Sequence, residues 1–351
     1  MRFQEGEPRP GIIGAGSAYP RRVFSNADVA NAINRSRDGV NRMAGRIGVK
    51  ERHWVELGGE VATSDLAITA IQKALVSAGI SANKLVLISV GTSSPDHIAS
   101  PDAPVVQHAL GIPTNVRALD LGNNACVGFL HAIGNSIIEL TSRARKSGPH
   151  AIAGVEIMTP ISRTAKPGIA TMFGDGGGAV IVDNFTPPKD APKGIGMAFG
   201  ADGSHALDLY IPAGGSRKPT TMETVRNNEH TIYMNGDIVR DNAILRMSEI
   251  ALEAILDAGM TPDDVNWFLP HQANMEIVNG VIDTLNLDRR RVLVNIGRRG
   301  NMSAGSIPSV LADNVESGVI KPYDFVLAIA FGAGFNYGAV GMPYAGPQRS
   351  T

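Results

Sequence analysis

Two side chains that lie far apart in the 351-residue sequence have types that together can perform nucleophilic chemistry. Cys126 is the single cysteine of the chain, and His271 lies early in its last quarter. A cysteine and a histidine from separate parts of a chain are the minimum for thiol catalysis, with the histidine available as acid or base. The segments around both residues must therefore fold so that the two side chains meet.

Cys126 stands between a strand-like segment and a helix-like one. It follows the partly apolar run 116–121 through a Gly-Asn-Asn turn and opens the largely apolar segment 127–140. A strand that feeds a helix in this way places the sulfur over the first turn of the helix. Unpaired N–H groups and the positive end of the helix dipole stabilise a thiolate there. The alternative is a buried cysteine that acts as a small hydrophobic residue.

The composition is that of an ordinary globular protein, with 43% hydrophobic and 19% charged residues and a net charge of −1. The charge balance gives no reason to expect nucleic acid or a membrane surface as a partner. A single cysteine excludes an internal disulfide and a cysteine-rich zinc site, so we expect no metal. The sequence shows no apolar run long enough to cross a membrane and no signal-peptide pattern, which predicts a cytoplasmic protein.

An internal repeat predicts how the segments are arranged. Residues 78–90 line up with residues 258–270 at an offset of 180, and an amphipathic helix precedes each, at 63–78 and 241–258. Further along, an offset of 175 places Cys126 on Asn301. Two such halves, residues 1–185 and 186–351, predict a pseudo-twofold α/β protein with mostly parallel, buried strands.

The repeat brings three residues together. The equivalent loops of the two halves meet near the pseudo-axis, so Cys126 and Asn301 are expected to be neighbours. The strand 266–270 ends directly at His271, at the carboxyl end where α/β sheets bind ligands. Each of these has an alternative interpretation, His271 as a hydrogen-bonded core histidine and Asn301 as a turn residue.

Several further segments are assigned by pattern. We expect strands at 11–19, 85–90, 151–157 and 179–182, helices at 25–34 and 104–110, a tight turn at 174–178, and a boundary loop at 185–192. The basic, glycine-containing segment 42–52 is either a surface for an anionic ligand or a solvated loop.

Seven short motifs resemble one known family. In order they are Asn-Ala-Cys126-Val-Gly-Phe, Phe173-Gly-Asp-Gly-Gly-Gly-Ala, Pro212-Ala-Gly-Gly-Ser-Arg, Tyr233-Met-Asn-Gly-Asp, Leu269-Pro-His271-Gln-Ala-Asn, Gly300-Asn301-Met-Ser-Ala-Gly-Ser-Ile-Pro and Phe331-Gly-Ala-Gly-Phe. Each is weak alone. Together, and over essentially the whole chain, they resemble β-ketoacyl-acyl-carrier-protein synthase III of the thiolase superfamily.

The resemblance implies a thiolase-like five-layer αβαβα fold with two pseudo-twofold-related halves, usually a homodimer, and a two-step covalent reaction. Cys126 would attack an acyl thioester, and its N–H and that of Gly334 would form an oxyanion hole. His271 and Asn301 would bind a malonyl thioester carbonyl and stabilise the enolate left by loss of CO₂. Phe331 would be the aromatic residue over the active site.

The resemblance also implies the substrates and the partners. The acyl donor would be a thioester of coenzyme A or of an acyl-carrier protein, with no permanently bound cofactor. The donor site differs from the family pattern at one position and keeps a neighbouring motif. Arg42 stands where the family has a tryptophan that stacks on adenine, and Arg52 closes the retained motif Gly48-Val-Lys-Glu-Arg, which makes both tentative donor-binding residues.

The family's basic surface for an acidic carrier protein is also altered. Glu276 and Asp283 occupy the corresponding positions, and like charges would repel the carrier. Ala333 replaces the middle glycine of the C-terminal motif. These changes indicate a specialised relative with another acyl donor or acceptor, as in secondary metabolism.

Three functions follow from this sequence. The first is decarboxylative Claisen condensation of an acyl thioester with a malonyl thioester. The second is acyl transfer from Cys126 to a hydroxyl or amine of a small-molecule acceptor, with His271 as general base. The third is a non-catalytic binding module in which Cys126 is unreactive.

Overall fold

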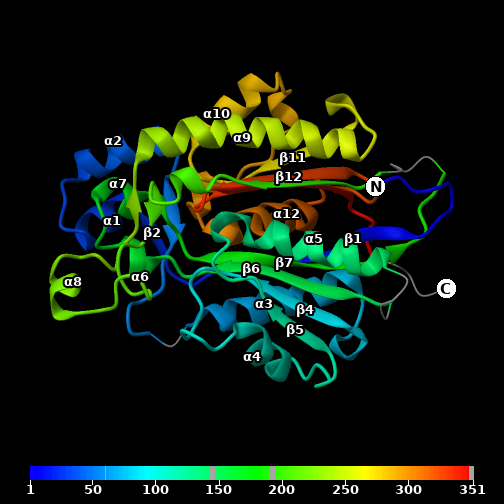
Figure 1. The fold of residues 1–351 in the computed structure, drawn as a ribbon, viewed down its shortest axis with the longest axis horizontal. Helices are drawn as coiled ribbons and strands as arrows, with labels where there is room; N and C mark the ends of the chain where they lie inside the picture. The colour runs from blue at the N-terminus through cyan, green and yellow to red at the C-terminus, as the bar shows by residue number, and fades with distance from the viewer. Residues whose placement is uncertain (60, 143–146, 190–193, 348–351) are drawn as a thin grey trace.

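Five layers of secondary structure make up the protein. The computed structural model describes residues 1–59, 61–142, 147–189 and 194–347. Two mixed β-sheets alternate with three layers of helices, and one helical layer lies between the sheets (Figure 1). This is the five-layer αβαβα arrangement that the sequence predicts.

Each half of the chain supplies one sheet. The first sheet has the order β1 (Arg9–Ala18), β7 (Gly176–Phe185), β6 (His150–Glu156), β4 (Leu87–Gly91) and β5 (Arg117–Asp120). The second has the order β11 (Trp267–Pro270), β12 (Phe325–Gly332), β13 (Asn336–Pro343) and β8 (Gly196–Ala201). The strands are mostly buried, as expected for sheets covered on both faces.

The expectation of mostly parallel strands is wrong. Within the described residues three pairings of these two sheets are parallel, β4 with β5, β4 with β6 and β11 with β12. The other four pairings are antiparallel. A strand that is buried on both faces is a continuous apolar run whether it pairs in parallel or antiparallel fashion. The sequence pattern therefore did not distinguish parallel from antiparallel pairing.

Six helices form the three helical layers. The outer face of the first sheet is covered by α3 (Thr63–Ala78) and α4 (Asp102–Ala109), and that of the second by α9 (Gly236–Asp257) and α10 (Met275–Thr284). The central layer is α5 (Gly128–Thr141) and α12 (Ser306–Glu316), which pack between the two sheets (Figure 1). One apolar cluster fills this central space, and two others lie under the outer helices.

The remaining elements border these layers. They are β2 (Val23–Ser25), β3 (Glu51–His53), β9 (Leu209–Tyr210), β10 (Tyr233–Met234), α1 (Asn26–Ala32), α2 (Arg37–Ile47), α6 (Thr159–Ser162), α7 (Pro167–Met172), α8 (Met222–Arg226), α11 (Ile296–Arg299), and the 3₁₀ turns η1 (Ala82–Lys84), η2 (Ala125–Val127), η3 (Gly203–His205), η4 (Pro262–Asp264), η5 (Arg289–Arg291) and η6 (Ser303–Gly305). Within the described ranges, none of the helices is both long and apolar enough to cross a bilayer.

Several predicted segments have different bounds or types. The segment 42–52 is not a loop, because most of it belongs to helix α2 and strand β3. The glycines of the predicted tight turn at 174–178 largely belong to β7, and a Cβ on Gly177 would clash with the Gly154 carbonyl oxygen of β6. Helix α3 has the predicted bounds, but Val76 of its expected apolar side is 82% exposed. The predicted boundary loop lies partly outside the described residues.

The structure corrects the register of the repeat around Cys126. Turn η2 leads into α5 at Gly128 and turn η6 leads into α12 at Ser306, which are 178 positions apart. Ala125 and Ser303, at the start of the two turns, share a positive φ of 44° and 45°. Cys126 therefore corresponds to Ala304 and not to Asn301. The division of the chain at residue 185 stays a prediction.

Candidate active site

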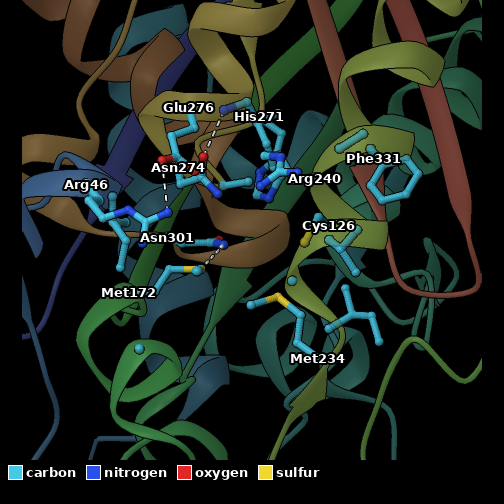
Figure 2. A pocket seen from close by; sticks show the side chains of 18 of the residues that line it. Arg46, Cys126, Met172, Met234, Arg240, His271, Asn274, Glu276, Asn301 and Phe331 are labelled. Atoms are coloured by element: carbon cyan, nitrogen blue, oxygen red, sulfur yellow. Dashed lines mark hydrogen bonds and ion pairs between the residues drawn. The ribbon is translucent and has the colours of Figure 1, made fainter. Parts of the chain in front are cut away.

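A cavity of about 270 Å³ collects most of the residues singled out in the sequence. Figure 2 shows Cys126, His271, Asn301 and Phe331 around it, with helix residues from both halves of the chain. The lining residues come from α2, α7, α9, α10, the short strands β9 and β10, turn η2, the segment before η6 and the ends of β11 and β12. Most of them are apolar, with a few convergent polar groups, which is the usual composition of a small-molecule site.

Cys126 reaches the cavity through the strained turn that carries it. It lies in the middle of η2, directly before α5, and its residue is only partly buried. The end of β12 packs against the turn so closely that a Cβ on Gly332 would lie 2.9 Å from the Cys126 nitrogen. Glycine at position 332 thus allows the backbone of β12 to approach the nucleophile's own N–H.

The resting state of Cys126 differs from the expected thiolate. Burial, which is the largest cause, raises the pKa of the thiol to about 12, with a smaller opposing effect from Ser303. Desolvation of the sulfur thus outweighs the helix N-terminus that the sequence indicated. Cys126 is a neutral thiol near pH 7, and ionisation must accompany its reaction.

His271 is a neutral hydrogen-bonding group in this site. The backbone N–H of His271 donates to the Ile329 carbonyl oxygen at 2.7 Å, which fixes the residue at the end of β11 against β12. The side chain is buried, and this burial lowers its pKa to about 3. Its ring Nδ1 has no hydrogen-bond partner among the described residues. A neutral imidazole can polarise a carbonyl oxygen without carrying a positive charge into the cavity.

Asn301 is oriented by its own turn. Its Oδ1 accepts a hydrogen bond from the Ser303 N–H at 2.8 Å, and its N–H donates to the Met172 carbonyl oxygen at 3.0 Å. Because Oδ1 is occupied, the Nδ2 donor is the end left for the cavity, where it lies 3.7 Å from the Met172 sulfur. Phe331 is buried beside these groups, with its ring centroid 4.6 Å from that of Phe335.

The structure separates the other predicted residues from the cavity. Arg42 is exposed on α2 and Gly334 is not among the described lining residues. Arg52 is fully buried, and its guanidinium donates to Asn26 Oδ1 at 2.8 Å and to the Thr171 carbonyl oxygen at 2.7 Å. The prediction that Arg52 binds the acyl donor is therefore wrong, because its guanidinium is buried and bonded to other groups of the protein.

Sequence reasoning missed two kinds of lining residue. Four methionines line the cavity, Met43, Met172, Met234 and Met247, and their flexible side chains suit an apolar wall that adapts to its ligand. The charged lining residues are Arg46, Asp237, Arg240 and Glu276. Arg46 lies one helical turn after Arg42, so a helical pattern over 37–47 would have included it.

The charged lining residues form ion pairs with one another and with their neighbours. Arg46 of α2 pairs with Glu276 of α10 at 3.5 Å, with the side chains 77% and 43% exposed (Figure 2). Arg240 of α9 pairs with Asp237 and with Asp241, each at 2.9 Å. Such exposed pairs contribute little to stability and can be exchanged for a ligand's charges. The described residues include no cluster of three His, Cys, Asp or Glu side chains that could hold a metal.

Fold and site together define a layered α/β protein with a cysteine nucleophile and two neutral hydrogen-bonding side chains. Comparison with known proteins agrees with this class. Residues 255–344 match the family model described as "3-Oxoacyl-[acyl-carrier-protein (ACP)] synthase III C terminal".

Similarity to curated relatives extends over nearly the whole chain. The β-ketoacyl-[acyl-carrier-protein] synthase III of Caldanaerobacter subterraneus subsp. tengcongensis is 35% identical, with 93% of this chain and 95% of the relative covered. The 3-oxopimeloyl-[acyl-carrier-protein] synthase of Rhodothermus marinus is also 35% identical, with 95% and 93% covered.

A solved structure gives the same result. The β-ketoacyl-[acyl-carrier-protein] synthase III of Thermus thermophilus superimposes with a TM-score of 0.82 at 32% identity, and 95% of this chain and 98% of that chain are covered. The chain belongs to the β-ketoacyl-acyl-carrier-protein synthase III family, within the thiolase superfamily.

Proposed function

We propose that the protein condenses an acyl thioester with a malonyl thioester, with Cys126 as the nucleophile and with loss of CO₂. The observation that carries the proposal is the presence of Cys126, His271 and Asn301 in one cavity within a β-ketoacyl synthase III fold. The 35% identity to curated synthases over nearly the whole chain supports this reaction over simple acyl transfer.

The reaction begins with acylation. The Cys126 sulfur attacks the thioester carbon, a new sulfur–carbon bond forms, and the donor thiol leaves with the proton that Cys126 gives up. The Cys126 N–H is one donor for the oxyanion of the tetrahedral intermediate. The adjacent Gly332 to Gly334 segment is the candidate for the second donor, with Gly334 as the residue the sequence indicates.

Condensation uses the two neutral side chains. His271 and the Asn301 Nδ2 donate hydrogen bonds to the malonyl thioester carbonyl and stabilise the enolate formed when CO₂ leaves. The carbanion attacks the acyl carbon, the bond to the Cys126 sulfur breaks, and the sulfur leaves as a thiolate that takes up one proton from water to restore the thiol. A carboxylate in place of either donor would repel the enolate, so neutral groups suit this step.

The donor approaches past the charged lining residues. Arg46 and Arg240 line the cavity, while Arg42 lies one helical turn before Arg46 on α2 and is not among the lining residues. We assign to Arg46 the electrostatic attraction of the donor's phosphate groups, with Arg42 as an outer contact. Glu276 lies beside Arg46 and favours a donor other than a strongly acidic carrier surface. Both coenzyme A and carrier-protein thioesters remain candidate donors.

A homodimer fits the edge of the first sheet. In the described chain β5 (Arg117–Asp120) pairs with β4 alone, and its side chains are only half-buried or exposed. An exposed strand edge of this kind is a site for pairing with a second copy. Dimerisation and a cytoplasmic location remain predictions from the sequence.

Intact-protein mass spectrometry tests the proposed function. The protein is incubated with a panel of acyl thioesters of coenzyme A and of a carrier protein, and then with the malonyl thioesters. We expect an acyl adduct on Cys126 that disappears with release of CO₂ when malonyl thioester is added. An adduct that persists until an alcohol or amine is added would instead identify an acyltransferase, and the absence of any adduct would exclude both activities.

A further inference from the structure

The two neutral donors of the cavity are carried by different segments of the chain. His271 directly follows β11, and Asn301 lies two residues after the end of α11, yet both face one cavity (Figure 2). In the proposed condensation both side chains must reach the same carbonyl oxygen, and small errors in such geometry are costly to the rate. Groups that hold α11 at a fixed distance from the end of β11 therefore decide whether the two donors can act together.

Gln272 connects the two segments at the start of α11. It is the residue after His271, and its side chain is fully buried. Its Nε2 donates to the Pro270 carbonyl oxygen at 2.6 Å, and its Oε1 accepts from the Asn295 and Ile296 N–H groups at 3.2 and 3.3 Å. Both N–H groups are at the start of α11, where a helix offers them no acceptor of its own. This one side chain thus ties the end of β11 to the beginning of α11.

Asp313 holds both ends of α11 from the central helix α12. Its Oδ2 accepts from Asn295 Nδ2 at 3.3 Å and lies 3.5 Å from Nη2 of Arg299, the last residue of α11. Its Oδ1 accepts from Ser17 Oγ at 3.1 Å and from the Tyr19 hydroxyl at 2.9 Å. Both members of the ion pair are largely buried, so salt screens this pair less than the exposed pairs of the cavity. A carboxylate suits the position because it only accepts and can serve donors on both of its oxygens.

Arg299 extends these contacts toward the first half of the chain. Its Nη1 lies 2.8 Å from His53 Nε2, and its guanidinium carbon lies 3.7 Å from the centre of the Tyr19 ring. An arginine can only donate, so His53 Nε2 is the acceptor and its Nδ1–H donates to the Pro20 carbonyl oxygen at 2.6 Å. The last side chain of α11 is therefore held by a carboxylate, an imidazole and an aromatic ring.

The link from α11 to Asn301 has little slack. Only Gly300 separates Arg299 from Asn301, and the Gly300 N–H donates to the Ile296 carbonyl oxygen at 2.9 Å. A Cβ on Gly300 would lie 3.0 Å from the Met172 carbonyl oxygen, which is the same oxygen that accepts the Asn301 N–H. A displacement of α11 is therefore passed on to Asn301 and is not absorbed by a loose loop.

The matching position of the first half has a different residue and different contacts. At the offset of 178 between the two central helices, Asp313 of α12 corresponds to Asn135 of α5. The Asn135 Nδ2 donates to Glu139 Oε1 of the same helix at 3.3 Å. The carboxylate that binds α11 thus belongs to the half of the chain that carries the two neutral donors.

We propose that Asp313 and Gln272 are positioning residues that fix the distance between His271 and Asn301. Gln272 sets where α11 begins, and Asp313 sets its direction by binding the side chains at both of its ends. Neither residue is among the described residues that line the cavity, so each acts through the segment that it holds. The inference rests on the proposed function, because it concerns the two donors of the condensation step.

Two measurements on each variant test the proposal. A crystal structure of the variant shows whether Asn301 has moved relative to His271, and this measurement needs no substrate. The rate of acyl loading on Cys126 and the rate of CO₂ release from malonyl thioester after loading separate the two steps of the reaction. A general loss of folded protein would lower both rates together, whereas misplaced donors would lower the second rate alone.

Gln272→Met and Asp313→Asn have the larger expected effects. Gln272→Met keeps a buried side chain of similar length and removes the hydrogen bonds to both segments. Asp313→Asn keeps the shape, turns one acceptor into a donor and leaves Arg299 without its paired charge. In both variants we expect Asn301 to move by about 0.5–1 Å relative to His271. Condensation should fall by about tenfold or more, while acyl loading should stay within about twofold of the wild-type rate.

A milder variant and a matched control complete the set. Arg299→Lys keeps the charge and loses the planar group that stacks and reaches two acceptors, so condensation should fall by about threefold. This variant tests the proposal even if the other two do not fold. Asp324→Asn is the control, because Asp324 Oδ2 accepts from Trp267 Nε1 at 2.8 Å and from the Lys321 N–H at 2.9 Å, at the opposite end of β11. It should leave the geometry of the site and both rates close to wild type.

Two results would overturn the proposal. One is an equal loss of acyl loading and of condensation in the variants that fold. The other is an Asn301 that keeps its place relative to His271 in all of their crystal structures. If the wild type itself releases no CO₂, the proposed function fails, while the crystal structures still decide whether Asp313 and Gln272 position the two donors.

Discussion

The two 3₁₀ turns before the central helices share a backbone conformation and differ in chemistry. Turn η2 contains Cys126 and turn η6 contains Ala304 at the matching position, and each starts with a residue of φ near 45°. In the first half the turn presents a nucleophile to the cavity. In the second half Asn301 and Ser303, from the same segment, provide hydrogen-bond donors. The same turn thus occurs once in each half. The first half carries the nucleophile on it, and the second half carries hydrogen-bonding groups.

The ends of β4 and β11 show the same division. Gly91 ends β4, and His271 stands at the matching position after β11, 180 residues later. A Cβ on Gly91 would lie 2.7 Å from the Gly128 carbonyl carbon at the start of α5. The first half thus uses this position for the close packing of α5, which supports the nucleophile's turn. The second half uses it for a functional side chain.

The largest expected effect tests whether the two turns are interchangeable. Cys126→Ala should abolish acyl loading, which intact-protein mass spectrometry would show as a missing adduct with every thioester. Adding Ala304→Cys to that variant should not restore loading, because Ala304 is 1% exposed and is not among the described residues that line the cavity. An acyl adduct on this double variant would show that the matching turn also opens to the cavity, and the comparison would fail.

The second prediction separates the roles of the two halves in the reaction. His271→Ala and Asn301→Ala should each leave acyl loading on Cys126 near wild type and lower the rate of condensation by about 10²–10³-fold. CO₂ release from malonyl thioester after loading is the measurement. His271 should also show no ionisation in the condensation rate between pH 5 and pH 8, because its pKa of about 3 keeps it neutral over that range.

A different outcome would reassign His271. If His271→Ala loses acyl loading as strongly as condensation, the histidine serves as the base for Cys126. The condensation rate of the wild type could instead decrease as the pH is lowered past 6.5, with no such decrease in His271→Gln. In that case the pKa of His271 is the ordinary one for histidine. Either result would move the second half's contribution from the second step to the first.

The sequence was sufficient where pattern and geometry coincide. Helix 63–78 has its predicted bounds because its apolar positions repeat at helical spacing, and β11 ends at Pro270, directly before His271, as its run of apolar residues indicates. The fold class and the convergence of Cys126, His271 and Asn301 were also predictable. All of these depend on order along the chain and on strand–loop–helix connections.

Properties set by three-dimensional surroundings were not predictable. The sequence indicated a thiolate at Cys126, but the structure gives a neutral thiol. The desolvation that raises the thiol pKa comes from residues distant in the chain, which the sequence did not place around the sulfur. Arg52 looked like a ligand-binding arginine, although it is buried by segments that the sequence could not place beside it. The repeat was misaligned by three residues at Asn301, since insertions in the connecting loops are invisible in two dissimilar halves.

The third prediction compares the buried and the exposed arginine near the site. Arg52→Met leaves the Thr171 carbonyl and Asn26 Oδ1 without their donor, so the free energy of unfolding should fall by about 2–4 kcal/mol. Arg46→Met removes an exposed ion pair and should change the free energy of unfolding by less than about 1 kcal/mol. Denaturant unfolding of both variants measures the difference. Arg46→Met should instead raise KM for the acyl donor, which Arg52→Met should not do if it still folds.

The smallest expected effect concerns Glu276 beside the cavity. Glu276→Arg replaces an acidic residue of α10 with a basic one and removes the partner of Arg46. Because a carrier protein is acidic, kcat/KM for a carrier-protein thioester should rise several-fold at low salt, and the gain should fade as salt screens the charges. Glu253→Arg, on the neighbouring helix α9 and outside the described cavity lining, is the matched control. An equal gain in both variants would mean that net charge alone acts, and no gain in either would show that the donor does not approach over α10.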